Sequence, residues 1–205
     1  MLKILPLLRK EILFDESPIL LKTAPDKNWD KDWKVMAGEW KYENGALIGI
    51  ETGNKGGILF SRKSFNEPVM MSFKISTVLP ATRDVNAVFC AHWDTSIDYL
   101  GESYVCGLNG WYEHKCGIER NNGTFALNSG YQYVPGKEVE MVVGSIDGHC
   151  FMFVDDKLIS EFYDEHPLYD GHMGFSPYCT MLKIRDIEIR KIKWRPRGQV
   201  YEPEF

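Results

Sequence analysis

The chain has 205 residues, of which 44% are hydrophobic and 26% are charged, and its formal net charge is -5 at pH 7. This composition is ordinary for a globular protein, and an all-β sandwich of about 200–250 residues can form one domain. The acidic balance argues against nucleic acid as a partner, and no run approaches the ~20 apolar residues of a membrane span. We therefore expect a single domain over residues 1–205 with neither a nucleic-acid nor a membrane partner.

The first segment, MLKILPLLRKEILF, begins like a secretory signal peptide. Its apolar core is interrupted by Pro6 and ended by Arg9 and Lys10, and no small-residue cleavage site follows. The stretch from Leu5 to Phe14 is also the only candidate for helical periodicity. We expect a cytoplasmic protein with very little helix.

Two dipeptides predict tight β-hairpins. Apolar runs flank Asn44-Gly45 in the first half of the chain and Asp147-Gly148 in the second half. Both dipeptides accept positive φ at two successive positions, as the preferred two-residue hairpin turns require. Many short strands with turns about 8–12 residues apart are typical of a sandwich or a barrel.

The last expected strand, residues 181–194, changes register along its length. Leu182 and Ile184 share one parity, whereas Ile187 and Ile189 share the other. A one-residue slip moves every later side chain to the opposite face, so we infer a β-bulge near Arg185-Asp186. The expected β-sandwich covers about residues 12–194, and residues 195–205 are expected to form a C-terminal arm on the surface.

The cysteines are odd in number and contain no CxxC pair. An odd set cannot pair completely within one chain, so reduced and mostly buried thiols are the simpler interpretation. A disulfide between the second and the third of them is the alternative. The five are Cys90, Cys106, Cys116, Cys150 and Cys179.

Two groups of phrases resemble concanavalin A-like lectin/glucanase sandwiches. The opening group is DWKV at 32–35, GEW at 38–40 and NGAL at 44–47; the closing group is FVDDKLI at 153–159, DGHMGF at 170–175 and IRDI at 184–187. They resemble the uncharacterised bacterial YesU-like family, and 3-keto-disaccharide hydrolase-like domains share them. The resemblance implies an antiparallel two-sheet jelly roll of galectin-like form and a connection to carbohydrate. The ExDxE signature of the glucanases is missing, so no catalytic pair is carried over.

Chemistry-bearing side chains gather in the stretch from Asn86 to Asn122, which holds two of the five histidines and two of the six tryptophans. Side chains alternate between the faces of a strand. In residues 86–93 we assign Phe89, Ala91 and Trp93 to the core face, and Asn86 and His92 to a groove face. In residues 111–120 we assign Tyr112, His114 and Arg120 to the groove face, and Trp111 and Glu119 to the opposite face.

We expect this groove to bind an oligosaccharide or glycoside and to cleave it by glycosidic cleavage or β-elimination. His, Tyr and Arg supply proton transfer and charge neutralisation, whereas aromatic rings stack on sugars. The candidate catalytic residues are His92, Tyr112, His114 and Arg120. The candidate substrate-binding residues are Asn86, Asn109, Trp111 and Glu119.

Several alternatives stay open. His114 and Arg120 would lie roughly 20 Å apart on a straight strand, so they would contact successive sugars unless Gly117 marks a bend. A lectin-like module without chemistry, or an assembly subunit that keeps only the fold, would use the same stretch. No zinc motif and no obvious cofactor is present, whereas a divalent cation such as calcium and a homo-oligomer are both compatible with the sequence.

Overall fold

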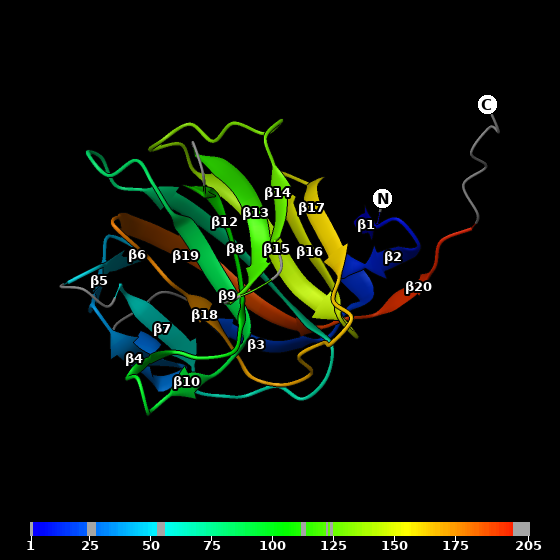
Figure 1. Ribbon diagram of the computed structural model, residues 1–205, viewed down its shortest axis with the longest axis horizontal. Helices are drawn as coiled ribbons and strands as arrows, with labels where there is room; N and C mark the ends of the chain where they lie inside the picture. Colours follow the sequence, from blue (N-terminus) through cyan, green and yellow to red (C-terminus); the bar gives the residue numbers. More distant parts are fainter. Residues whose placement is uncertain are drawn as a thin grey trace.

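The computed structural model describes residues 2–23, 28–52, 56–111, 114–121, 123 and 125–198, with Phe125 described for its backbone alone. Two antiparallel sheets stack face to face (Figure 1). The helical segments in the described residues are two short 3₁₀ turns, Phe14–Glu16 and Trp29–Lys31. The expected all-β, two-sheet sandwich is therefore confirmed.

The seven-stranded sheet lies toward the viewer in Figure 1. Its strands, in order across the sheet, are β14 (Phe125–Asn128), β13 (Lys115–Arg120), β12 (Tyr104–Trp111), β9 (Val85–Ala91), β18 (His172–Phe175), β7 (Ile58–Ser61) and β4 (Trp33–Ala37). A small hairpin of β10 (Trp93–Asp94) and β11 (Tyr99–Leu100) follows β9.

The eight-stranded sheet lies behind it. Its strands, in order, are β17 (Lys157–Tyr163), β16 (His149–Val154), β15 (Val139–Ile146), β8 (Val69–Thr77), β19 (Met181–Lys191), β6 (Ala46–Ile50) and β5 (Glu39–Glu43), and β3 (Ile19–Thr23) pairs with β19 beside β6. The main core fills the space between the two sheets. Its largest fully buried side chains are Trp33, Phe73, Phe89, Tyr104 and Phe175.

The chain ends form a third, three-stranded sheet of β1 (Ile4–Pro6), β2 (Lys10–Leu13) and β20 (Trp194–Pro196). Leu5, Leu7 and Ile12 pack on the outer face of the eight-stranded sheet. The segment from Leu5 to Phe14, the one helix candidate, is thus mostly strand and turn, because its apolar side chains meet a sheet in alternation. Part of the expected arm is strand too, and residues 199–205 lie outside the described residues.

The predicted turns and bulge are confirmed. Asn44-Gly45 and Asp147-Gly148 each have positive φ at both positions, with values of 50° and 78° in the first and 51° and 84° in the second. The pairing of β19 with β8 shifts between Arg185 and Glu188, and Asp186 has a φ of 55°. The φ preferences of the turn residues account for the two hairpins, and the parity of the apolar side chains accounts for the bulge.

All five cysteines are free thiols. Cys106, Cys116 and Cys150 are buried in the main core, while Cys179 is exposed. Burial raises the pKa of the Cys106 thiol, so the core cysteines act as small apolar side chains.

Candidate functional site

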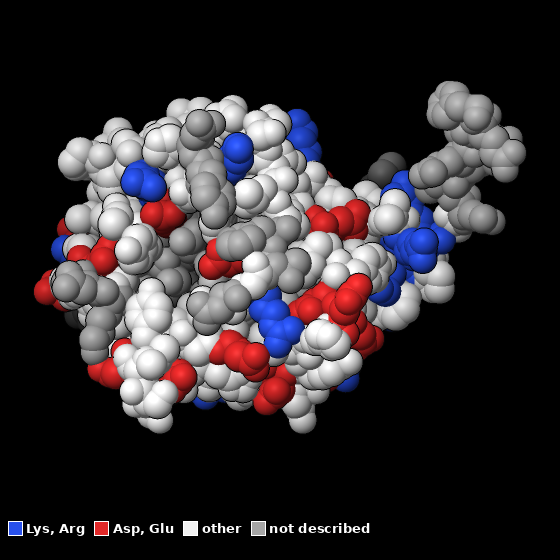
Figure 2. All heavy atoms as spheres, viewed as in Figure 1, with Lys and Arg blue, Asp and Glu red and all other residues white. Residues whose placement is uncertain are grey.

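A cavity of about 270 Å³ opens on the outer face of the seven-stranded sheet, the face toward the viewer in Figure 2. We call it the outer-face pocket. Among the described residues, its walls combine three aromatic rings with carboxyl, amide and guanidinium groups from five segments of the chain. The lining residues are Arg83, Asp84, Asn86, Tyr99, Leu100, Val105, Gly110, Trp111, Glu119, Asn121, Ser176 and Tyr178.

Strand alternation builds the floor of the pocket. Asn86 on β9 is paired with Gly107 on β12, and Val105 is paired with Glu119 on β13. A Cβ atom at Gly107 would lie 2.1 Å from Asn86 Oδ1, so only glycine leaves room for the amide. Asn86 Oδ1 is buried and has no hydrogen-bond partner among the described residues. Leaving a buried amide oxygen without a hydrogen-bond partner costs free energy, and such a group in a folded protein calls for a functional explanation.

Asp84 is the most buried acid of the pocket, with 8% of its surface exposed. Burial raises its pKa to about 6, although the positive charges of Arg83 and His114 oppose this shift. Asp84 N donates to Asn109 O at 3.4 Å. Asn109 Nδ2 in turn donates to Thr82 O at 2.5 Å. Asn109 thus positions the turn that carries Asp84.

Trp111 and Glu119 are joined across β12 and β13. Trp111 Nε1 donates to Glu119 Oε2 at 2.5 Å, which fixes the indole beside the cavity. Burial raises the pKa of Glu119, and the hydrogen bond from Trp111 opposes that shift. The pocket therefore holds two carboxyl groups, those of Asp84 and Glu119, whose protonated forms are favoured over those of exposed acids.

A bulge in β12 shapes this wall. Gly107 pairs with Gly117, whereas Trp111 pairs with Lys115, so residues 108–110 stand opposite a single residue of β13. Asn109 has a φ of 60°, which marks the distorted position. Because of this bulge, β12 reaches the 82–84 turn and closes one side of the pocket.

Three expected binding residues line the outer-face pocket, namely Asn86, Trp111 and Glu119, and Asn109 supports it from the side. Arg120 lies on the inner face of β13, opposite to the expected face. It shares parity with the core residues Cys116 and Ile118. The apolar character of those two neighbours was the signal that Arg120 points inward.

Arg120 closes the edge of the core. Its Nη1 donates to Asp164 Oδ2 at 3.1 Å and to the carbonyl of His166, and its Nη2 donates to Glu102 Oε1 at 3.1 Å. Tyr104 Oη also donates to Asp164 Oδ2, at 2.7 Å. These contacts attach the segment after β17 to the seven-stranded sheet.

His92 lies outside the lining of the pocket. It is exposed, and its Nε2 is 3.0 Å from Asp170 O. Cys90 has a φ of 47°, and the pairing of β9 with β18 shifts beside it. This bulge moves Ala91 and Trp93, expected in the main core, to the outer cluster of the seven-stranded sheet.

His114 is an exposed turn residue immediately before β13, with a φ of 64°. It contributes to the site through its charge, which lowers the pKa of Asp84. Tyr112, the fourth candidate catalytic residue, lies outside the described residues.

Sequence reasoning missed Arg83, Asp84, Tyr99 and Tyr178. Asp84 and Arg83 precede the first alternating residue of β9, so strand parity gave no reason to include them. Tyr178 follows β18, and only the pairing of β18 with β9 brings it to the pocket. Tyr99 comes from the β10–β11 hairpin. The local sequence pattern does not show toward which part of the sheet this hairpin folds.

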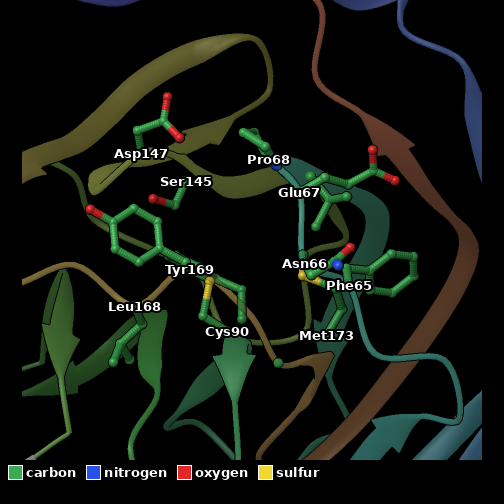
Figure 3. A pocket seen from close by; sticks show the side chains of 13 residues that line it. Phe65, Asn66, Glu67, Pro68, Cys90, Ser145, Asp147, Leu168, Tyr169 and Met173 are labelled. Atoms are coloured by element: carbon green, nitrogen blue, oxygen red, sulfur yellow. The ribbon is translucent and has the colours of Figure 1, made fainter.

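A second cavity of about 60 Å³ lies between the two sheets at one end of the sandwich. Cys90 and Leu168 border it on one side, and Ser145 and Asp147 on the other (Figure 3). Burial, with a smaller contribution from Asp170, raises the pKa of Cys90 to about 12. The Cys90 thiol therefore stays protonated and is a poor nucleophile.

The described part of the chain carries neither a candidate metal centre nor a membrane-spanning helix. No group of three or more His, Cys, Asp or Glu side chains there is placed to hold a metal ion. No helix among the same residues has the length and apolar character that crossing a membrane requires.

The chain resembles solved structures in fold. A protein of unknown function with a galectin-like fold from Bacillus subtilis is 13% identical, with a TM-score of 0.68 over 85% of this chain and 96% of that one. The carbohydrate-binding module CBM66 from Bacillus subtilis is 14% identical, with a TM-score of 0.59 over 78% and 95%. The exoplasmic/lumenal domain of VIP36, in a form bound to Ca²⁺ and Man3GlcNAc, is 10% identical, with a TM-score of 0.57 over 93% and 91%.

No family model and no curated protein matches the sequence. At these identities, the likeness to solved structures establishes the galectin-like sandwich and nothing finer.

Proposed function

We propose that the protein binds carbohydrate in the outer-face pocket. The observation that carries this proposal is the sharing of one cavity by Trp111, Tyr99 and Tyr178 with the polar groups of Asn86 and Glu119. Aromatic faces stack on sugar rings, and amide and carboxylate groups hydrogen-bond sugar hydroxyls. The likeness in fold to a carbohydrate-binding module and to a domain bound to Man3GlcNAc supports the same ligand class.

Two finer expectations accompany this proposal. Kinship with the YesU-like family is supported by the galectin-like fold alone. A reducing, cytoplasmic location is supported by the five free thiols.

Glycan binding to Trp111→Ala tests the proposal. We expect the variant to lose binding, because the stacking ring and the donor to Glu119 are both removed. Trp194→Ala is the matched control, since Trp194 is a partly exposed tryptophan on β20 outside the pocket. Binding is measured on an array of glycans, with calcium and then with a chelator, which also tests the predicted divalent cation. Equal binding by both variants and the wild type would reject the pocket as the ligand site.

Glycosidic cleavage is a second candidate because Asp84 has a pKa of about 6. An acid whose pKa is raised toward neutrality can protonate a leaving glycosidic oxygen. In this version Asp84 is the proton donor, and His114 acts through its charge on Asp84. The expected roles of His92, Tyr112 and Arg120 stay predictions.

Product formation from the bound glycans, read by mass change, tests this second candidate. We expect the rate to fall as pH rises above about 6, because Asp84 then loses its proton. Asp84→Asn should abolish cleavage, while Asp170→Asn, an exposed aspartate outside the pocket, should leave the rate unchanged. Binding without any cleavage would reject glycosidic cleavage and support a lectin-like function.

A further inference from the structure

We infer that the outer-face pocket receives the terminal unit of an uncharged glycan, and that it excludes both chain interiors and acidic sugars. This inference rests on the proposed function and specifies its ligand. It follows from what covers the sheet on each side of the pocket, from the size of the cavity and from its charge.

The β10–β11 hairpin forms the first wall. Leu100 is buried against Val88 and Val105, side chains of β9 and β12 that point to the outer face. Asn121 Nδ2 holds the hairpin in place by donating to Leu100 O at 3.0 Å and to Gly101 O at 2.8 Å. In Figure 1 β10 stands in front of the lower part of the sheet. A glycan chain that ran along the outer face would therefore meet this hairpin.

The segment after β18 forms the second wall. Gly57 N donates to Pro177 O at 2.7 Å, which ties this segment to the chain before β7. A Cβ atom built on Gly56 would lie 3.6 Å from the Tyr178 ring and 3.7 Å from Tyr99 Oη. The two tyrosines therefore converge at Gly56 and close the pocket toward β7. These contacts oppose the extension of a ligand past the two tyrosines on this side.

The volume agrees with one terminal unit. Sites for drug-sized ligands occupy about 300–1,000 Å³, and this cavity of about 270 Å³ lies below that range. It offers room for a single ring and its substituents rather than for several consecutive sugars.

The charge of the pocket selects against acids. When both acids are ionised, Asp84 and Glu119 outnumber Arg83 among the described charged lining residues, and the charges of Glu51 and His114 act on Asp84 with opposite signs. A uronate or sialate carboxylate would add a like charge at short range, which is unfavourable in a partly desolvated site. A neutral sugar offers hydroxyl donors to the same carboxyl groups.

An array of oligosaccharides attached through their reducing ends tests the inference. One subset shares the terminal sugar and varies the interior, and another shares the interior and varies the terminal sugar, including uronic and sialic acids. We expect the signal of the wild-type protein to follow a neutral terminal sugar and to disappear when the terminal sugar is an acid. A signal that follows the interior sequence, or persists on acid-terminated glycans, would overturn the inference while leaving the proposed function intact.

A second variant checks the role of the walls. Replacing Tyr99 and Tyr178 together by alanine opens the side at Gly56, so the ratio of terminal to interior recognition should fall. Tyr169→Ala is the control, because Tyr169 is an exposed tyrosine at the second cavity. An unchanged ratio in the double variant would contradict the inference that Tyr99 and Tyr178 close the pocket at Gly56. Failure of the wild-type protein to bind any glycan on the array would instead reject the proposed function itself.

Discussion

At the scale of single residues, Asp84 links the pocket to the stability of the fold. Its pKa is about 6 in the folded chain against 3.8 for an unperturbed aspartate, because it is buried. The folded state holds this proton more tightly than the unfolded state does. The free energy of unfolding therefore falls as pH rises from about 4 to above 6. This stabilising contribution is not regained at higher pH.

Asp84→Asn should accordingly stabilise the protein at neutral pH. The amide carries no charge to desolvate, so we expect a gain of up to about 3 kcal/mol near pH 7.5 that shrinks toward zero near pH 4. Urea unfolding at the two pH values measures this gain, with the exposed Asp170→Asn as control. A gain of equal size at both pH values would show that titration of Asp84 is not its cause.

Arg120 should behave as a structural residue. Its removal leaves Asp164, whose side chain is 6% exposed, without its cationic partner. We expect Arg120→Ala to lower the free energy of unfolding by ~1–3 kcal/mol and to leave the affinity for glycans nearly unchanged. Thermal unfolding and glycan binding measured on one preparation separate the two effects. Loss of glycan binding with an unaltered free energy of unfolding would instead show that Arg120 takes part in the binding site.

At the scale of elements, the sheet of β1, β2 and β20 adds a second apolar layer behind the sandwich. Ile12 on β2 is fully buried there against the outer face of the eight-stranded sheet. Ile4 on β1 belongs to the same small sheet but is 40% exposed. The two residues allow the effect of burial to be compared within one small sheet.

Ile12→Ala should cost about 2–5 kcal/mol of unfolding free energy, because it leaves a cavity between two sheets. Ile4→Ala should cost far less, since water already reaches that side chain. Chemical denaturation of both variants provides the comparison. Similar small losses in both would mean that the terminal sheet contributes little to global stability.

At the scale of the whole molecule, the cysteines report on cooperative unfolding. Cys179 is the one exposed thiol of the five, and Cys106, Cys116 and Cys150 are buried between the sheets. Reaction of the buried thiols therefore requires the sheets to separate.

Thiol titration of the native protein should show a single fast-reacting group, and titration in denaturant without reductant should reach five. Cys179→Ser should remove the fast phase and leave four groups in denaturant. Three or fewer groups in the denatured wild type would mean that a disulfide forms, against the free thiols of the structure.

Part of this architecture is local and was therefore accessible to sequence reasoning. The hairpin turns at Asn44-Gly45 and Asp147-Gly148 depend on φ preferences of adjacent residues, and the bulge near Asp186 on the parity of four apolar side chains. The candidate stretch likewise contained Asn86 and Trp111, which do line the pocket.

Tertiary structure alone decided which side chains meet. One residue of bulge reverses the face of every later side chain, so the irregularity at Cys90 changed the face on which Trp93 lies. Tyr178 reaches the pocket through the pairing of β18 with β9, a contact between strands far apart in the chain. The sequence by itself determined an all-β sandwich with sugar-compatible side chains on β9, β12 and β13. The pocket depended on long-range pairing, because the physical cause of its shape is the packing of distant segments and not the preference of any one of them.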